Sequence, residues 1–327
     1  MISPSDLIHL PYTRDLTEGG IAYAVRSLPY VYTHASGSIY DRLRRTVASV
    51  IVELAFRRYL SEQNIPFEVI SAAPFTDPNQ YDVSLGGRRC DIKSFLISYH
   101  EQIAEMKRNP QVVLDAPALV PSDQNAAEGR SDKDIYLFAF LSGLIAASQS
   151  DLQKAIYTDQ PYYLIHAMPE KWLRPVKWNP LGALVLKSDS EEAQIVELGG
   201  QVEGREMRTV TVEVPPRTRI QIDEGFYALA YIHSKSLPKA RIGIHSPGLQ
   251  ETHIINSLDW GNIWVYGRDI LLAGYLTRAE FSRNAHSILP GTRVFQYEHT
   301  RTKNLAVQVS ELKSLAELLE QVKVWNK

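Results

Sequence analysis

YDVSLGGRRCDIKS, residues 81–94, is the stretch that decides the expected fold. Its two runs of alternating apolar and polar residues flank Gly86-Gly87, a dipeptide typical of a two-residue hairpin turn. A turn at this position places Asp82 directly opposite Asp91 on the neighbouring strand. Cross-strand neighbours have Cβ atoms about 5 Å apart, so two carboxylates there repel by roughly 3 kcal/mol. A divalent cation between them turns this repulsion into attraction.

Strand alternation gives this hairpin a polar side and an apolar side. Lys93 lies on the same side as Asp91, whereas Cys90 and Ile92 point to the other side. Carboxylate oxygens are hard ligands of the kind that Mg²⁺ prefers. A lysine beside such an ion can hold an attacking water and help to deprotonate it. The hairpin therefore predicts a magnesium site with Asp82 and Asp91 as ligands.

An amphipathic helix is expected upstream of the hairpin, over residues 40–62. Pro66 ends it. Glu53 borders its apolar stripe and is expected to point along the sheet toward the acidic pair. The alternative is an ion pair between Glu53 and Arg57, one turn later. The stripe consists of Leu43, Val47, Val50, Ile51, Leu54 and Ala55.

The order of Glu53 on a helix, Asp82 before a hairpin and Asp91-Ile92-Lys93 on the next strand resembles the PD-(D/E)xK nuclease superfamily. This group contains most type II restriction endonucleases. The resemblance covers roughly residues 40–170 and departs from the family pattern at Tyr81, where the family name has proline. It implies a restriction-endonuclease-like mixed sheet flanked by helices. Two later family strands would correspond to DIYLFAFL and PYYLIHAM.

The resemblance also implies the roles of the four site residues. Asp82 and Asp91 would bind Mg²⁺, with Mn²⁺ as a possible substitute, Lys93 would assist the water, and Glu53 would support the site. The implied reaction is hydrolysis of phosphodiester bonds in double-stranded DNA. A type II restriction enzyme acting as a homodimer is the favoured subtype, since two symmetric sites can cut two strands.

Other interpretations of the hairpin are kept open. Two more acidic-x-Lys tripeptides, Glu105-Met106-Lys107 and Glu311-Leu312-Lys313, lie in helical texture with no carboxylate opposite, so context selects the hairpin. The structural alternative is an exposed hairpin with Asp82 near Arg89 and Asp91 near Lys93 as ion pairs. The functional alternatives are a defence, repair or mobile-element nuclease whose β module binds a partner or effector, and a non-catalytic DNA-binding protein of the same fold.

The chain as a whole predicts an α/β fold with two domains. Residues 1–175 are expected to form the nuclease domain with an N-terminal arm. Residues 176–327 are expected to form a β-rich accessory module that ends in a helix capped by Ser310. The segment 116–134 is rich in turn formers and charge, which predicts a long exposed loop.

Composition limits the possible partners and compartments. With 35 Lys and Arg against 37 Asp and Glu, the formal net charge is -2, so a nucleic acid must be met by a local basic patch. A single cysteine, no signal-peptide order and no long apolar window favour a cytoplasmic protein without a membrane segment. Zinc-ligand spacings, phosphate loops, dinucleotide fingerprints and GxSxG elbows are absent from the sequence. The candidate DNA contacts are Arg42, Arg44, Arg45, Arg57, Arg58, Arg88 and Arg89.

Overall fold

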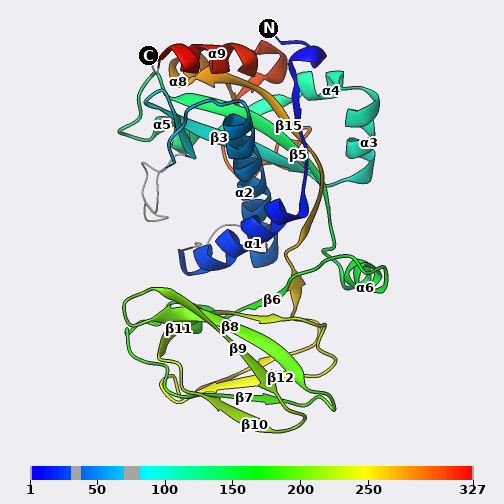
Figure 1. The fold of residues 1–327 in the computed structure, drawn as a ribbon, viewed down its shortest axis with the longest axis vertical. Coiled ribbons are helices and arrows are strands. Elements are labelled where there is room, and N and C mark those ends of the chain that lie inside the picture. Colours follow the sequence, from blue (N-terminus) through cyan, green and yellow to red (C-terminus); the bar gives the residue numbers. More distant parts are fainter. Residues whose placement is uncertain (1, 31–37, 70–81, 326–327) are drawn as a thin grey trace. The chain divides into compact units, whose positions relative to one another are not determined.

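The computed structural model describes residues 2–30, 38–69 and 82–325, and the chain is mixed α/β, as expected (Figure 1). It divides into two compact units, each assembled from segments distant in the sequence. Within the described ranges, no helix has the length and apolar character needed to cross a membrane. Unit 1 consists of Met1–Gly20, Arg45–Ile145 and Val265–Lys327, and unit 2 of Ile21–Arg44 and Ala146–Trp264.

Unit 1 is built on a five-stranded mixed sheet in the order β1-β15-β5-β3-β2. Strands β3 and β5 are parallel, and the other neighbours are antiparallel. The expected buried strand DIYLFAFL is confirmed as part of β5, whose first nine residues are buried. The strands are β1 (Ile8–Leu10), β2 (Val83–Leu85), β3 (Arg88–Ile97), β5 (Ile135–Ile145) and β15 (Val265–Thr277).

The expected hairpin is confirmed between β2 and β3. Val83 pairs with Cys90 and Leu85 with Arg88, which is the register that the sequence predicts. Gly86 and Gly87 have φ values of 57° and 73°. Two consecutive residues with positive φ match the type of two-residue turn that suits the twist of a hairpin. Tyr81 lies outside the described residues.

The expected amphipathic helix is confirmed as α2 (Ile39–Glu62). It begins after Ser38, whose hydroxyl accepts a hydrogen bond from the backbone N–H of Asp41 at 3.1 Å, an N-cap. It ends before Asn64, whose φ of 54° lies in the left-handed region common after helices. Val47 and Ile51 of the apolar stripe are fully buried. Helix α1 (Arg14–Ser27) precedes it in the chain.

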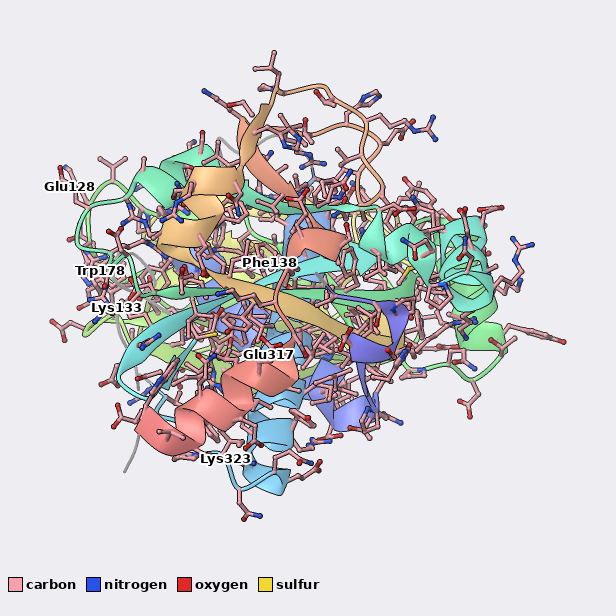
Figure 2. All side chains as sticks on the ribbon, turned by 90° about the horizontal axis from the view of Figure 1, so that it is seen from above. Glu128, Lys133, Phe138, Trp178, Glu317 and Lys323 are labelled. Atoms are coloured by element: carbon pink, nitrogen blue, oxygen red, sulfur yellow. The ribbon has the colours of Figure 1, made fainter. Side chains whose placement is uncertain are left out.

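A second layer covers the other face of the unit 1 sheet. Phe95 on β3 and Phe138 and Phe140 on β5 pack with buried residues of strands β4 and β17 and of helices α3, α4 and α8. Figure 2 shows Phe138 near the centre of unit 1 and Glu317 on the outer helix α9. These elements are α3 (His100–Arg108), α4 (Gln111–Leu114), β4 (Pro117–Pro121), α5 (Ser122–Ala126), α8 (Arg278–Asn284), β16 (His286–Ile288), β17 (Asn304–Gln308) and α9 (Leu315–Trp325).

Unit 2 contains two antiparallel sheets, in the orders β14-β6-β11-β8-β9 and β10-β7-β12-β13. Side chains of both sheets share one core, for example Leu186 and Ile244 of one sheet with Leu198 and Phe226 of the other. The elements are α6 (Gln149–Tyr157), β6 (Leu164–Ala167), α7 (Glu170–Leu173), β7 (Leu184–Ser188), β8 (Gln194–Val202), β9 (Met207–Val214), β10 (Arg219–Ile222), β11 (Phe226–Ser234), β12 (Ile242–Ser246), β13 (Glu251–Ile255) and β14 (Gly261–Asn262).

These units differ from the expected domains 1–175 and 176–327. The long strand β15 pairs with β5 in the unit 1 sheet, so the C-terminal residues from Val265 onward belong to unit 1. The segment PYYLIHAM contributes β6 to a unit 2 sheet, so its expected place in the first domain together with DIYLFAFL is wrong. Local apolar patterns identify a strand but not its distant partner, which explains both differences.

Two local predictions are also wrong. The segment 116–134 is not one long loop, because it contains β4 and α5, and β4 pairs with β17 from the far end of the chain. Ser310 does not cap the last helix. It lies in a 3₁₀ turn (Val309–Glu311), and α9 starts only at Leu315. The apolar run before this helix is used by β17, which separates the two elements.

The hairpin turn offers a test of its packing. A Cβ added at Gly86 would lie 2.7 Å from Trp325, whereas one added at Gly87 meets nothing within 4 Å. Both substitutions to alanine place a side chain at positive φ, which costs roughly 1–2 kcal/mol. We therefore expect Gly86→Ala to lower the free energy of unfolding, measured in urea, by more than Gly87→Ala. Equal losses would show that the contact with Trp325 does not constrain the turn.

Candidate active site

Asp91 and Lys93 lie on β3, where the parallel neighbour β5 covers one edge and β2 the other. The predicted alternation is present, because Cys90 and Ile92 are buried among apolar residues on the opposite side. Asp91 itself is only 6% exposed and stands beside Tyr136 in the parallel register. The site is thus at the edge of a core, where charges interact strongly.

Asp82 stands at the point where the ladder between β2 and β3 ends. Its Oδ2 accepts a hydrogen bond from the backbone N–H of Ile92 at 2.5 Å, in place of a strand carbonyl. Burial, then the nearby charge of Glu53, and more weakly that of Asp91 raise the pKa of Asp82 to about 7. The N–H of Ile92 opposes this shift. A carboxyl group with this pKa is only partly ionised at neutral pH.

Asp91 is neutralised by two cations. Its carboxylate forms an ion pair with Arg130, and the Nζ of Lys93 lies 3.6 Å from the same oxygen. Lys93 also donates a hydrogen bond to Oε1 of Gln124 at 3.0 Å. The Nε of Arg130 is buried and has no hydrogen-bond partner among the described residues. The guanidinium is therefore held mainly by its contact with Asp91.

Glu53 reaches the site from α2 and pairs with Arg57, the alternative that the helical spacing predicted. Nη2 of Arg57 also donates to the backbone oxygen of Asp82 at 2.9 Å, so the pair is tied to the hairpin. Burial raises the pKa of Glu53 and the charge of Arg57 lowers it, with burial the stronger cause.

Glu53 and Asp91 do not lie on the same side of β3. The helix carrying Glu53 contacts β3 through a hydrogen bond between Ser49 and Ser94 at 3.2 Å. Ser94 alternates with Asp91 along the strand and so points to the opposite face. Asp82, at the end of the hairpin, is influenced by the charges of both. Asp82 therefore lies between the two carboxylates, and the charge of Glu53 acts on it more strongly than that of Asp91.

The donor chemistry of this acidic pair suits a hard divalent ion. Two carboxylates from adjacent strands can serve Mg²⁺, which usually keeps several waters in its octahedral shell. Among the described residues, no three His, Cys, Asp or Glu side chains are grouped as metal ligands. The residues present thus fit an ion held by Asp82 and Asp91 with water or substrate oxygens, and not a closed protein cage.

The arginines expected to contact DNA have partners within the protein. Arg57 pairs with Glu53, Arg58 with Asp15, and Arg88 lies 3.6 Å over the ring of Trp325. Arg89 donates to the backbone oxygen of Gly129 at 3.3 Å. In unit 2, Arg44 is 4% exposed and pairs with Asp41, so it is not a surface contact. Arg42 and Arg45 also take part in interactions within the chain.

Sequence reasoning missed Arg130 and Gln124. Both lie in the segment that was expected to be a loop, and Arg278 anchors it by donating to the backbone oxygens of Asn125 and Arg130. Glu128 and Lys133, which flank Arg130 in the sequence, lie at the edge of unit 1 in Figure 2. The sequence feature that could have located Arg130 was the buried strand that begins at Ile135. If it runs parallel to β3, the residues before it arrive beside Asp91.

No protein-family model, curated protein or solved structure matches this chain significantly. The geometry of the acidic hairpin is therefore the main indication of function.

The raised pKa of Asp82 predicts a pH-dependent stability. Because the folded state holds this proton more tightly than the unfolded chain, the stabilisation is present below about pH 4 and is lost as pH rises through about 7. We compare the free energy of unfolding of Asp82→Asn with that of the wild type, in EDTA, at pH 5 and at pH 8. We expect this difference to shift in favour of the variant by on the order of 2 kcal/mol between pH 5 and pH 8.

Urea unfolding at the two pH values measures this difference. Asp115→Asn, an exposed aspartate in the same unit, is the matched control and should leave the pH dependence unchanged. A pH profile for Asp82→Asn that parallels the wild type would show that Asp82 is ionised in the folded protein throughout this range.

Proposed function

We propose that the chain is a Mg²⁺-dependent endonuclease that hydrolyses phosphodiester bonds of double-stranded DNA. The observation that carries this proposal is the convergence of Asp82, Asp91 and Lys93 at the open end of the hairpin, with the pKa of Asp82 raised by burial and by the charges of Glu53 and Asp91. A fold tolerates such a carboxyl group more readily when a cation joins it during function. The helix with Glu53 and the parallel strand beside β3 also agree with the family that the sequence resembles.

Each side chain then has a chemical task. Asp82 and Asp91 would hold the magnesium ion, which when bound supplies an activated water and polarises the phosphate. Lys93 is positioned to orient the attacking water by donating a hydrogen bond to it, because its Nζ lies near Asp91 and is fixed by Gln124. Glu53 and Arg57 would hold the end of the hairpin in place through the backbone oxygen of Asp82.

Arg130 would act as an internal counter-ion in the absence of metal. It occupies the carboxylate of Asp91, one of the two groups proposed to hold the ion. Metal binding would therefore require Arg130 to leave Asp91 at least in part. Its freed guanidinium would then be available to a phosphate, a group that arginine binds well.

The two ion pairs of Asp91 favour a second candidate, a DNA-binding protein of the same fold without catalysis. Asp91 already has two cationic neighbours, so the cluster is also consistent with a purely structural ion-pair network. Metal-dependent cleavage distinguishes the two candidates.

Plasmid cleavage with Mg²⁺ tests the proposed activity. Asp91→Ala and Lys93→Ala should each reduce the rate by at least about 100-fold, since each removes a group used in the chemical step. The matched controls are Glu105→Ala and Lys107→Ala, which alter the same type of tripeptide on the exposed face of α3 and should cut at the wild-type rate.

Discrete fragments would support a sequence-specific restriction enzyme, and a smear would support a nonspecific nuclease. Intact DNA at saturating Mg²⁺ and Mn²⁺ would contradict the proposed activity. An assembly state measured in solution by light scattering tests the proposed homodimer.

Arg130→Gln tests whether arginine and metal compete for Asp91. Without metal, we expect the loss of a buried ion-pair partner to lower the free energy of unfolding by about 3 kcal/mol. Added Mg²⁺ should raise the melting temperature of this variant by more than that of the wild type. Arg283→Gln, at an exposed position on α8, is the control. If Mg²⁺ stabilises neither protein, the proposed magnesium site is contradicted.

A further inference from the structure

The outer face of the sheet β10-β7-β12-β13 in unit 2 is hollowed. The hollow has a volume of about 470 Å³, within the range of small-molecule sites. It is separate from the acidic hairpin, and all of its lining residues belong to unit 2. Its floor and walls come from alternate residues of neighbouring strands, because residues two apart on a strand share a face. The principal lining residues are Lys187, Arg219, Arg241, Gly243, His245 and Ile254.

Gly243 lies in the middle of this face. Its cross-strand neighbours are Lys187 on β7 and Ile254 on β13. Along β12, Arg241 and His245 stand two residues before and after it, on the same face. Four side chains thus surround one position that has none, and the missing side chain makes the hollow.

Packing does not require a glycine at this position. A Cβ added at Gly243 would meet only the backbone oxygen of Lys187, at 4.0 Å, and its φ is not in the left-handed region. Glycine inside a strand weakens the strand, and it often marks a place where a ligand approaches the backbone closely. The space over Gly243 is therefore free for a bound group.

The charge of the hollow is positive. Three cations and one carboxylate line it, which leaves an excess of two positive charges. Asp189, the carboxylate, is engaged by Arg241 at 2.8 Å and by Lys187 at 3.4 Å. Arg219 pairs directly with Lys187 across the strands and has no ion-pair partner among the described residues. Asp189 already balances part of the charge of Lys187, so Arg219 is the cation with which an added anion would pair.

The other lining groups suit a small ligand. His245 uses Nδ1 to bond Oγ1 of Thr252 at 3.0 Å, which leaves Nε2 as the nitrogen that can meet a ligand. Val185 and Ile254 add apolar surface beside the charges. The lining contains no Phe, Tyr or Trp on which bases could stack, and it includes a carboxylate. Both features disfavour a single-stranded nucleic acid, which is usually bound through stacking and uniform positive charge.

We infer that this hollow binds a dianionic phosphate group of a small molecule over Gly243, with Lys187, Arg241 and His245 around it. The excess of two positive charges matches a phosphomonoester dianion or free phosphate. Arg219, on the neighbouring strand β10, adds to the positive electrostatic potential of the hollow. This phosphate site does not depend on nuclease activity, so it can be tested independently of the acidic hairpin.

Isothermal titration of the full chain with inorganic phosphate and with adenosine monophosphate, in EDTA and at constant ionic strength, tests this inference. The key variant is Gly243→Val, which places a side chain at the proposed phosphate position over residue 243. It should fold at least as stably as the wild type, because valine favours strands and its Cβ has room. Lys187→Ala removes a charge-assisted hydrogen bond. We expect each variant to weaken binding by about tenfold or more.

Lys154→Ala, at an exposed position on α6, is the matched control and should bind as the wild type does. Tighter binding of adenosine monophosphate than of phosphate would identify a phosphomonoester, and equal or weaker binding would identify free phosphate; either supports the site. The inference is overturned if neither probe binds, or if Gly243→Val binds as well as the wild type. It is also overturned if duplex DNA alone binds and loses affinity in both variants, because the face would then be a nucleic-acid surface.

Discussion

The repulsion among Glu53, Asp82 and Asp91 is the constraint on which the organisation of unit 1 depends. Each carboxylate is compensated in a different way. Glu53 has Arg57 from its own helix, and Asp91 has Arg130 and Lys93. Asp82 accepts the N–H of Ile92, but burial and the charge of Glu53 outweigh this hydrogen bond and raise the pKa of Asp82. Helix, hairpin and the segment before β5 are thus joined at one point by charge, in addition to their apolar packing.

Much of this arrangement could be predicted from the sequence because its signals are local. The Gly86-Gly87 turn sets the register of the hairpin, and the register alone brings Asp82 and Asp91 together. The apolar stripe of α2 fixes which side of the helix faces the sheet, and so brings Glu53 to the hairpin. These features involve residues close in sequence, whose geometry follows from standard strands, turns and helices.

The remaining features depend on contacts between distant segments. The pairing of β15 with β5 decides which unit contains the C-terminal residues. An apolar run in the sequence predicts a buried strand but does not identify the strand with which it pairs. The position of Arg130 follows from the parallel register between β3 and β5. The sequence predicts a long loop at Arg130 and so does not indicate its contact with Asp91. The helical spacing left open whether Glu53 points toward the acidic pair or pairs with Arg57; in the structure it pairs with Arg57, and its charge also acts on Asp82.

The neighbouring strands β5 and β15 also have a consequence for how the protein folds. Ile145 pairs with Val265, so the chain leaves the sheet of unit 1 and re-enters it at adjacent positions, with residues 146–264 between them. Closing so long a loop is entropically costly while the loop is a flexible coil. If those residues collapse first, the two strand ends are connected by a compact body and the search for their partner shortens. The sheet of unit 1 therefore cannot be completed before β15 has been synthesised. Until the ribosome has released β15, the edge of β5 that pairs with it stays exposed.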